Sequence, residues 1–135
     1  MITTVDVETS WQVTENGGYD PSPFHPDNIL VSVGINDEYY FTNHSEKIDE
    51  GCYHKIQSVL DKTTLLIGHN IKFDLMWLLE SGFKYTGRVY DTMLGEYILN
   101  RGIRKSLTLE MSCRRRKIGS KDNRIKEYTD RGIPF

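Results

Sequence analysis

The sequence predicts an α/β fold, in which a mixed sheet carries helices on its faces. Apolar and β-branched segments come first and include a hairpin, and later short strands alternate with helical segments. A hairpin requires antiparallel pairing, whereas a strand–helix–strand order favours parallel pairing. The sheet is therefore expected to contain both kinds of pairing.

Length and composition are typical of one globular domain. The chain has 135 residues, of which 38% are hydrophobic and 27% charged, so we expect a single domain over residues 1–135. The longest apolar run, Leu75–Leu79, has five residues, whereas a membrane helix needs roughly 20. The amino terminus has no signal-peptide pattern, and the two cysteines form no metal-binding motif. These features exclude a membrane protein and favour a cytoplasmic one, or the host cytoplasm if the source is viral.

Each expected element has a local signal in the sequence. Period-two or continuous apolar runs predict strands, and their ranges are Ile2–Glu8, Asn28–Ile35, Glu38–Thr42, Thr63–Gly68 and Arg88–Tyr90. Apolar residues at helical spacing predict helices, and their ranges are Asp49–Asp61, Ile71–Leu79, Asp91–Leu99 and Leu107–Lys117. Asp91 and Ser106 are expected to cap the last two helices. Glycines and prolines predict a loop over residues 14–28.

The first expected strand carries a pair of carboxylates, Asp6 and Glu8. Residues two apart on a strand face the same side, so both acids lie opposite the apolar residues Val5 and Val7. Neighbouring carboxylates repel each other unless a cation lies between them, and hard divalent cations prefer oxygen ligands. The alternative interpretation is a solvated strand end with ordinary surface acids.

A second group of polar residues follows the buried strand that ends at Gly68. Asn70 and Asp74 lie at the start of the next helix, and Asp74 has apolar neighbours on both sides, Phe73 among them. A carboxylate in such surroundings is unfavourable unless it is paired or bound to a metal. Alternatively, Asn70 caps the helix, Asp74 interacts with the positive helix terminus, and His69 is an exposed turn residue.

The order of these motifs resembles that of the ribonuclease-H-like 3′–5′ exonucleases of the DEDD (DnaQ-like) superfamily. Asp6 and Glu8 match the first exonuclease motif, and Asn70, Phe73 and Asp74 match the second. The finer similarity is to the proofreading exonuclease domain of a family A DNA polymerase. The resemblance implies a ribonuclease-H-like mixed sheet and a nuclease that acts on the 3′ ends of single-stranded DNA, with a polymerase domain or subunit as partner.

The resemblance also implies a two-metal site. Asp6, Glu8 and Asp74 would be the catalytic residues and the ligands of two Mg²⁺ or Mn²⁺ ions, which activate a water molecule and stabilise the leaving 3′ oxygen. Further residues would contact the substrate, namely Thr9, Trp11, Asn70 and Phe73.

One part of the family pattern differs in this chain. The family has a fourth carboxylate in a Tyr-x-x-x-Asp or His-x-x-x-x-Asp motif, whereas here Asp130 follows Tyr128 by two positions. We therefore expect a domain truncated before its final helix and third motif, with weak or no activity alone. The alternative is a catalytically impaired nucleic-acid-binding or polymerase-interaction module of the same fold, and an RNA exonuclease is a further one.

Charge is distributed unevenly along the chain. Residues 1–87 contain 5 Lys/Arg and 13 Asp/Glu, a net charge of −8, whereas residues 88–135 contain 12 and 6, a net charge of +6. The basic run Arg114–Lys117, with further basic residues over 121–126, would suit a phosphate backbone. Alternatively, the run is the solvated end of a helix, favoured by the helix dipole.

Overall fold

The computed structural model describes residues 1–42, 48–101 and 103–119. The chain divides into two compact units, residues 1–92 and the part from residue 93 onward, and each is described by itself. The expectation of a single domain stays a prediction. The third-motif residues Tyr128 and Asp130 and the basic residues over 121–126 lie outside the described residues.

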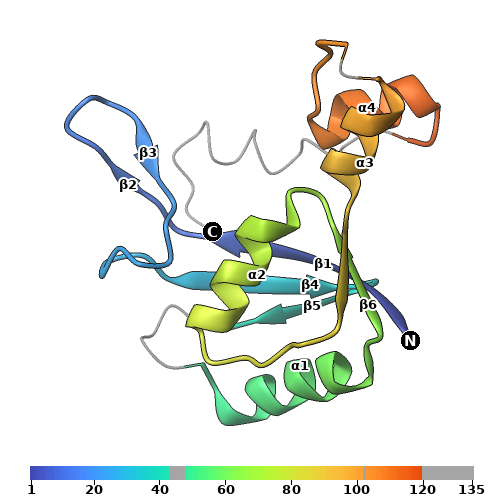
Figure 1. Cartoon of the computed structure of the whole chain (residues 1–135). Coiled ribbons are helices and arrows are strands. Elements are labelled where there is room, and N and C mark those ends of the chain that lie inside the picture. Colours follow the sequence, from blue (N-terminus) through green and yellow to red (C-terminus); the bar gives the residue numbers. More distant parts are fainter. Residues whose placement is uncertain (43–47, 102, 120–135) are drawn as a thin grey trace. The chain divides into compact units, whose positions relative to one another are not determined.

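A five-stranded mixed sheet forms the centre of the first unit (Figure 1). Its spatial order is β5-β4-β1-β6-β7. The central strand β1 pairs antiparallel with β4 and parallel with β6, while β4–β5 is antiparallel and β6–β7 parallel. This arrangement confirms the predicted α/β fold of the ribonuclease-H-like type. The strands are β1 (Ile2–Thr9), β4 (Leu30–Ile35), β5 (Glu38–Phe41), β6 (Leu65–Gly68) and β7 (Arg88–Asp91).

A short ribbon lies next to this sheet. Its strands β2 (Gln12–Val13) and β3 (Tyr19–Asp20) pair antiparallel, and Figure 1 shows the ribbon projecting beyond the end of β1. The prediction of a loop over residues 14–28 was therefore wrong in part. The reason is a tight turn at Gly17, whose φ of 76° suits glycine and brings the two short strands together.

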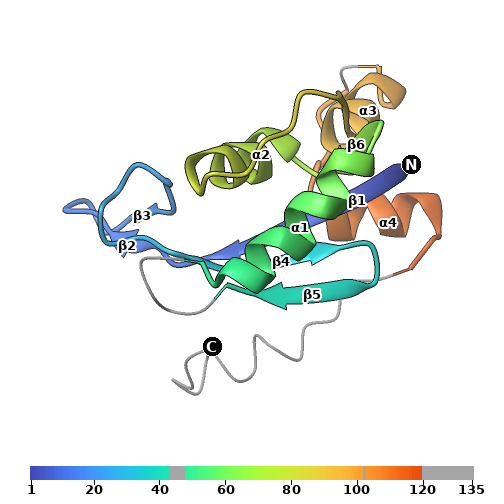
Figure 2. The same ribbon diagram turned by 90° about the horizontal axis from the view of Figure 1, so that it is seen from below.

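Two helices pack against the sheet in the first unit, α1 (Glu50–Lys62) and α2 (Ile71–Glu80). Asp49 caps α1 by accepting a hydrogen bond from the backbone N of Cys52 at 3.2 Å. Figures 1 and 2 show α2 and α1 beside the strands, and buried residues of both helices join those of the sheet in one core. The core consists of Val5, Val7, Leu30, Val33, Ile35, Ile56, Leu60, Leu66, Ile71, Trp77, Leu78 and Phe83.

The second unit contains most of α3 (Thr92–Leu99) and α4 (Leu109–Arg116). Thr108, and not the expected Ser106, is the N-cap of α4, because it directly precedes the first helical residue and accepts a hydrogen bond from the backbone N of Met111 at 3.3 Å. Within the described part of the chain, no helix is long and apolar enough to cross a membrane.

Candidate active site

The central strand presents Asp6 and Glu8 on its exposed face. Burial alternates along β1, so that Val5 and Val7 are 5% and 6% exposed while the two acids face solvent. Thr9 is half-buried at the end of the strand. The prediction that both carboxylates share one face, opposite an apolar face, is confirmed.

Asp74 reaches β1 from the first turns of α2. Its Oδ1 accepts a hydrogen bond from the backbone N of Val7 at 2.9 Å, and its side chain is only 4% exposed. The pairing of β1 with β6 ends where Thr4 lies opposite Ile67, so Val7 lies beyond the last partner on that strand. The Asp74 carboxylate therefore bonds a backbone amide of β1 at a position that β6 does not reach.

Asp74 is held in an environment that disfavours its charge. Burial raises its pKa to about 7 from the ordinary 3.8, although the hydrogen bond from Val7 opposes this rise. The negative charges of Asp6 and Asp91 raise the pKa further. Acidic side chains from β1 and β7 thus both disfavour the charged form of the α2 carboxylate at this edge of the sheet.

The turn between β6 and α2 is braced by residues at the end of β7. Asp91 Oδ1 accepts a hydrogen bond from the backbone N of Asn70 at 2.9 Å. The hydroxyl of Thr92 donates to the carbonyl of Gly68 at 3.2 Å and lies 2.9 Å from Nδ1 of His69. His69 is accordingly half-buried, and the alternative in which it is an exposed turn residue was wrong, because β7 packs beside the turn.

Asn70 has a backbone role in this turn. It occupies the N-cap position in the left-handed conformation, with φ 59° and ψ 50°, and within the described chain its side chain makes no capping hydrogen bond. The alternative in which the Asn70 side chain caps α2 was therefore wrong. The exposed amide is compatible with a contact to substrate.

Gly68 allows the turn to be this tight. A β-carbon at this position would lie 3.0 Å from Cγ1 of Ile71 and 3.3 Å from the carbonyl oxygen of Val5. Both distances are shorter than an ordinary van der Waals contact, so a larger residue would displace α2 or β1.

The aromatic residues near the site have different surroundings. Phe73 is half-buried and packs against the core, whereas Trp11 is 51% exposed and its ring lies edge-on to that of Tyr19, with centroids 4.5 Å apart. Trp77 is 3% exposed and donates from Nε1 to the carbonyl of Pro21 at 2.9 Å. Trp77 is thus a core residue.

The donor chemistry of this edge fits a hard divalent cation. Asp6, Glu8 and Asp74 offer only carboxylate oxygens, and the repulsion on Asp74 is of the kind that a bound cation relieves. Among the described residues, however, no three His, Cys, Asp or Glu side chains converge closely enough to hold a metal ion. Metal binding therefore requires these carboxylates to draw closer together than they are here.

The sequence analysis missed one contact at this edge of the sheet, which joins Asp91 to the start of α2. The sequence assigned it only to helix capping, yet its carboxylate bonds the backbone at the start of α2. A signal existed, because Asp91 ends a strand parallel to β6 and lies opposite Gly68 in the register. Polar residues at the carboxyl ends of adjacent parallel strands meet at one edge of a sheet.

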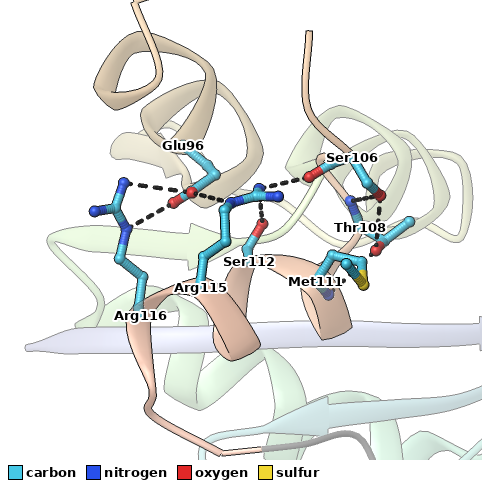
Figure 3. A network of polar contacts seen from close by, with 7 residues as sticks. All are labelled: Glu96, Ser106, Thr108, Met111, Ser112, Arg115 and Arg116. Atoms are coloured by element: carbon cyan, nitrogen blue, oxygen red, sulfur yellow. Dashed lines mark hydrogen bonds and ion pairs between the residues drawn. The ribbon is translucent and has the colours of Figure 1, made fainter. Parts of the chain in front are cut away.

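The three arginines of the basic run form ion pairs within the second unit, and Figure 3 shows those of Arg115 and Arg116. Glu96 of α3 is 6% exposed and accepts hydrogen bonds from Arg115 Nε at 3.1 Å and Arg116 Nε at 3.2 Å. Arg114 pairs with Glu110 at 2.9 Å. Each of the three arginines thus has a carboxylate partner, which favours a structural role for the run over phosphate binding.

Comparison with known protein families assigns the chain. Residues 14–110 match the model of a family described as 3′-5′ exonuclease. The chain belongs to this 3′-5′ exonuclease family. The match within the exonuclease domain includes the second motif, from Asn70 to Asp74, and begins after Asp6 and Glu8. Among curated proteins, none matches the chain. As an exonuclease domain, it has nucleic acid as its substrate.

Proposed function

We propose that this exonuclease domain removes nucleotides from single-stranded 3′ ends with the help of divalent metal ions, and that it proofreads for a DNA polymerase. One observation carries the proposal. A buried carboxylate, Asp74, is held against the central strand by Val7 and lies close enough to Asp6 to be repelled by it. The family match and the two motifs support the same function.

The proposed metal ligands are Asp6, Glu8 and Asp74, with Mg²⁺ or Mn²⁺ as the ions. Bound ions would lower the pKa of a water molecule and stabilise charge on the leaving 3′ oxygen. The bond from Val7 to Oδ1 fixes the orientation of the Asp74 carboxylate. The position of Asp6 and Glu8 on the exposed face of β1 keeps both accessible to a nucleic acid.

The proposed substrate contacts surround these carboxylates in the chain. Thr9 and Trp11 follow Glu8, and the exposed ring of Trp11 suits stacking on a base. Asn70 is the N-cap of α2 and lies about one helical turn before Asp74. Phe73 directly precedes Asp74.

A second candidate function is a nucleic-acid-binding or polymerase-interaction module with impaired catalysis. One observation favours it, namely that no three metal-ligating side chains converge within the described chain. The unusual spacing of Tyr128 and Asp130 points the same way, because the fourth family carboxylate does not stand at its usual distance.

Calorimetric titration of Mn²⁺ separates the two functions. The unmodified chain is compared with Asp6→Asn and Asp74→Asn, which preserve side-chain size but remove one ligand charge each. Asp37→Asn is the matched control, because Asp37 lies exposed in the β4–β5 turn. We expect both site variants to bind Mn²⁺ at least about 10-fold more weakly and the control to bind as the unmodified chain does. Equal binding by all four proteins, or by none, would contradict the metal-dependent function.

Digestion of labelled DNA tests the reaction itself. With 5′-labelled strands and Mn²⁺ or Mg²⁺, we expect slow shortening of single strands from the 3′ end and none with chelator. In labelled duplexes, we expect faster shortening at a mismatched than at a paired 3′ terminus. Competition between DNA and RNA strands separates the DNA-directed function from that of an RNA exonuclease. Binding of single strands without any shortening would favour the impaired module.

A further inference from the structure

We infer that Asp91 is a positioning residue for the carboxylate site, because it fixes the backbone turn that holds Asp74 against β1. This inference rests on the proposed function and deepens it, since it adds a residue from β7 to a site so far built from β1 and α2. The contact that carries it joins Asp91 Oδ1 to the backbone N of Asn70 at 2.9 Å.

The bond acts on a residue whose conformation needs support. Asn70 has a positive φ of 59°, a conformation that disfavours most residues with a side chain, although asparagine tolerates it better than others. The Asn70 amide is also at the start of a helix, where backbone donors lack partners within the helix. The half-buried Asp91 carboxylate satisfies that donor and thereby stabilises the left-handed turn.

The turn is directly connected to Asp74. The backbone N of Phe73 donates to the carbonyl of Asn70 at 3.0 Å, so the first turn of α2 starts from the residue that Asp91 holds. Asp74 directly follows Phe73, and its Oδ1 lies 2.9 Å from the backbone N of Val7. A shift of Asn70 would therefore move Asp74 away from β1.

β7 is well placed for this role. Asp91 lies opposite Gly68 in the parallel register of β6 and β7, at the point where the chain leaves the sheet. Thr92 adds a second brace from the same strand end, through its hydrogen bond to the carbonyl of Gly68. Asp91 at the end of β7 and Thr92 at the start of α3 thus bond all three residues of the turn, Gly68, His69 and Asn70.

The role depends on the acceptor oxygen of Asp91, and this property gives a sharp test. Asp91→Asn keeps an oxygen acceptor for the Asn70 amide and removes the charge, whereas Asp91→Ala removes both. A metal ligand would be lost in both variants, but a positioning bond would be lost only in the second. Asp37→Ala in the exposed β4–β5 turn is the matched control.

The experiment is a calorimetric Mn²⁺ titration of the full chain and these variants, well below their unfolding temperatures. We expect Asp91→Ala to bind Mn²⁺ about 10-fold more weakly, the usual effect of losing a residue that orients a ligand, and Asp91→Asn to bind within about 3-fold of the unmodified chain. Amide hydrogen exchange of the metal-free proteins gives a second readout. The Asn70 amide should lose protection in Asp91→Ala and keep it in Asp91→Asn.

The results that would contradict the inference differ from those that would contradict the proposed function. If Asp91→Asn binds as weakly as Asp91→Ala, Asp91 acts through its charge and the inference is wrong. If Asp91→Ala binds Mn²⁺ as the unmodified chain does, the inference is wrong while the proposed function stands. If the unmodified chain binds no Mn²⁺, the proposed function fails and this inference fails with it. If Asp91→Ala does not fold, Asp91→Asn alone tests the inference. This variant must bind Mn²⁺ as the unmodified chain does and keep the Asn70 amide protected, and loss of either property would contradict the inference.

Discussion

Asp74 combines one stabilising contact with an unfavourable burial. Its carboxylate accepts a hydrogen bond from Val7, yet it is 4% exposed and repelled by Asp6 and Asp91. Such a residue lowers the stability of the metal-free fold at neutral pH, and functional sites commonly carry this kind of destabilising group. The destabilisation is measurable, because it depends on pH.

The direction of this pH dependence follows from the pKa of Asp74 in the folded and in the unfolded chain. Its pKa is about 7 in the fold, against an ordinary 3.8. The folded chain therefore holds a proton over a pH range in which the unfolded chain has lost it. The stability associated with this proton is fully present below about pH 4 and is lost as the pH rises through about 7.

Asp74→Asn should therefore stabilise the metal-free protein above pH 7. Asparagine keeps an acceptor for Val7 but carries no charge, so we expect a gain of about 2–4 kcal/mol at pH 8, given about 1.4 kcal/mol for each unit of pKa shift. At pH 4 the gain should fall below about 1 kcal/mol, because the unfolded chain is then only partly ionised at Asp74. Urea unfolding in chelator at both pH values measures this difference, with Asp37→Asn as the control. An equal pH dependence in Asp74→Asn and the unmodified chain would contradict the assignment.

At the scale of single residues, the sequence predicted some contacts of the site and missed others. Asp6, Glu8 and Asp74 could be selected because acids beside apolar residues are unusual. The partner of Asp74 could not, because Val7 contributes its backbone and backbone donors leave no mark in a sequence. The Asn70 amide that donates to Asp91 leaves no mark either, and the signal for this contact was only that Asp91 ends a strand beside β6.

The β6–α2 connection is the element that decides where Asp74 lies. β6 ends at Gly68, and α2 begins only three residues later, at Ile71. This short connection lets a carboxylate in the helix reach the strand next to β6. A β-carbon at Gly68 would be crowded, because it would lie 3.0 Å from Cγ1 of Ile71 and 3.3 Å from the carbonyl oxygen of Val5.

Gly68→Ala should disturb both stability and metal binding. The added methyl group meets backbone and a branched side chain, so we expect a loss of about 1–3 kcal/mol, as for overpacking elsewhere, and weaker Mn²⁺ binding through the displaced α2. Gly51→Ala is the control outside the site, because its β-carbon would lie 3.2 Å from the Asp49 carboxylate that caps α1 and would touch neither α2 nor β1. Urea unfolding and Mn²⁺ titration of both variants measure the two effects. Normal stability in Gly68→Ala would show that the turn is looser than described.

The elements themselves could be predicted well from periodicity. The long helix α1 and the central strand β1 have strong patterns, and both lie within one or two residues of their expected ranges. The β2–β3 ribbon could not be predicted, because strands of two residues have no period, and only the turn at Gly17 brings them together. The cap of α4 was misplaced because Ser106 and Thr108 both belong to the residue types that cap helices.

The two compact units differ in how they are stabilised. Every buried hydrophobic residue of the described chain lies between Val5 and Phe83, within the first unit. In the second unit the buried residues are polar, namely Glu96, Asn100 and Ser112. Of these, Glu96 accepts hydrogen bonds from Arg115 and Arg116, which join α3 to α4. We therefore expect the second unit to depend on ionic contacts and the first on apolar burial.

The charge of Glu96 is central to this difference. Burial opposes its ionisation, but the hydrogen bonds from Arg116 and Arg115 outweigh that effect and hold the Glu96 pKa below its usual range. The stability that these bonds add is thus present at neutral pH and is lost as the pH falls through that lowered pKa. Removing the charge by mutation should imitate this loss at neutral pH.

Glu96→Gln should selectively loosen α3 and α4. The change removes both ion pairs and leaves two guanidinium groups without their buried partner, so amides of these helices should exchange faster. Amides of β1 and β6 should keep their rates, because within the described chain the hydrophobic core has no residue after Phe83. The matched control is Glu110→Gln, which breaks an i,i+4 pair whose arginine is 61% exposed and should change exchange little. Hydrogen exchange at neutral pH, followed residue by residue, measures all three proteins. Equal acceleration in β1 and in α4 would show that the two units unfold together, and the single-domain prediction for residues 1–135 would then be the better description.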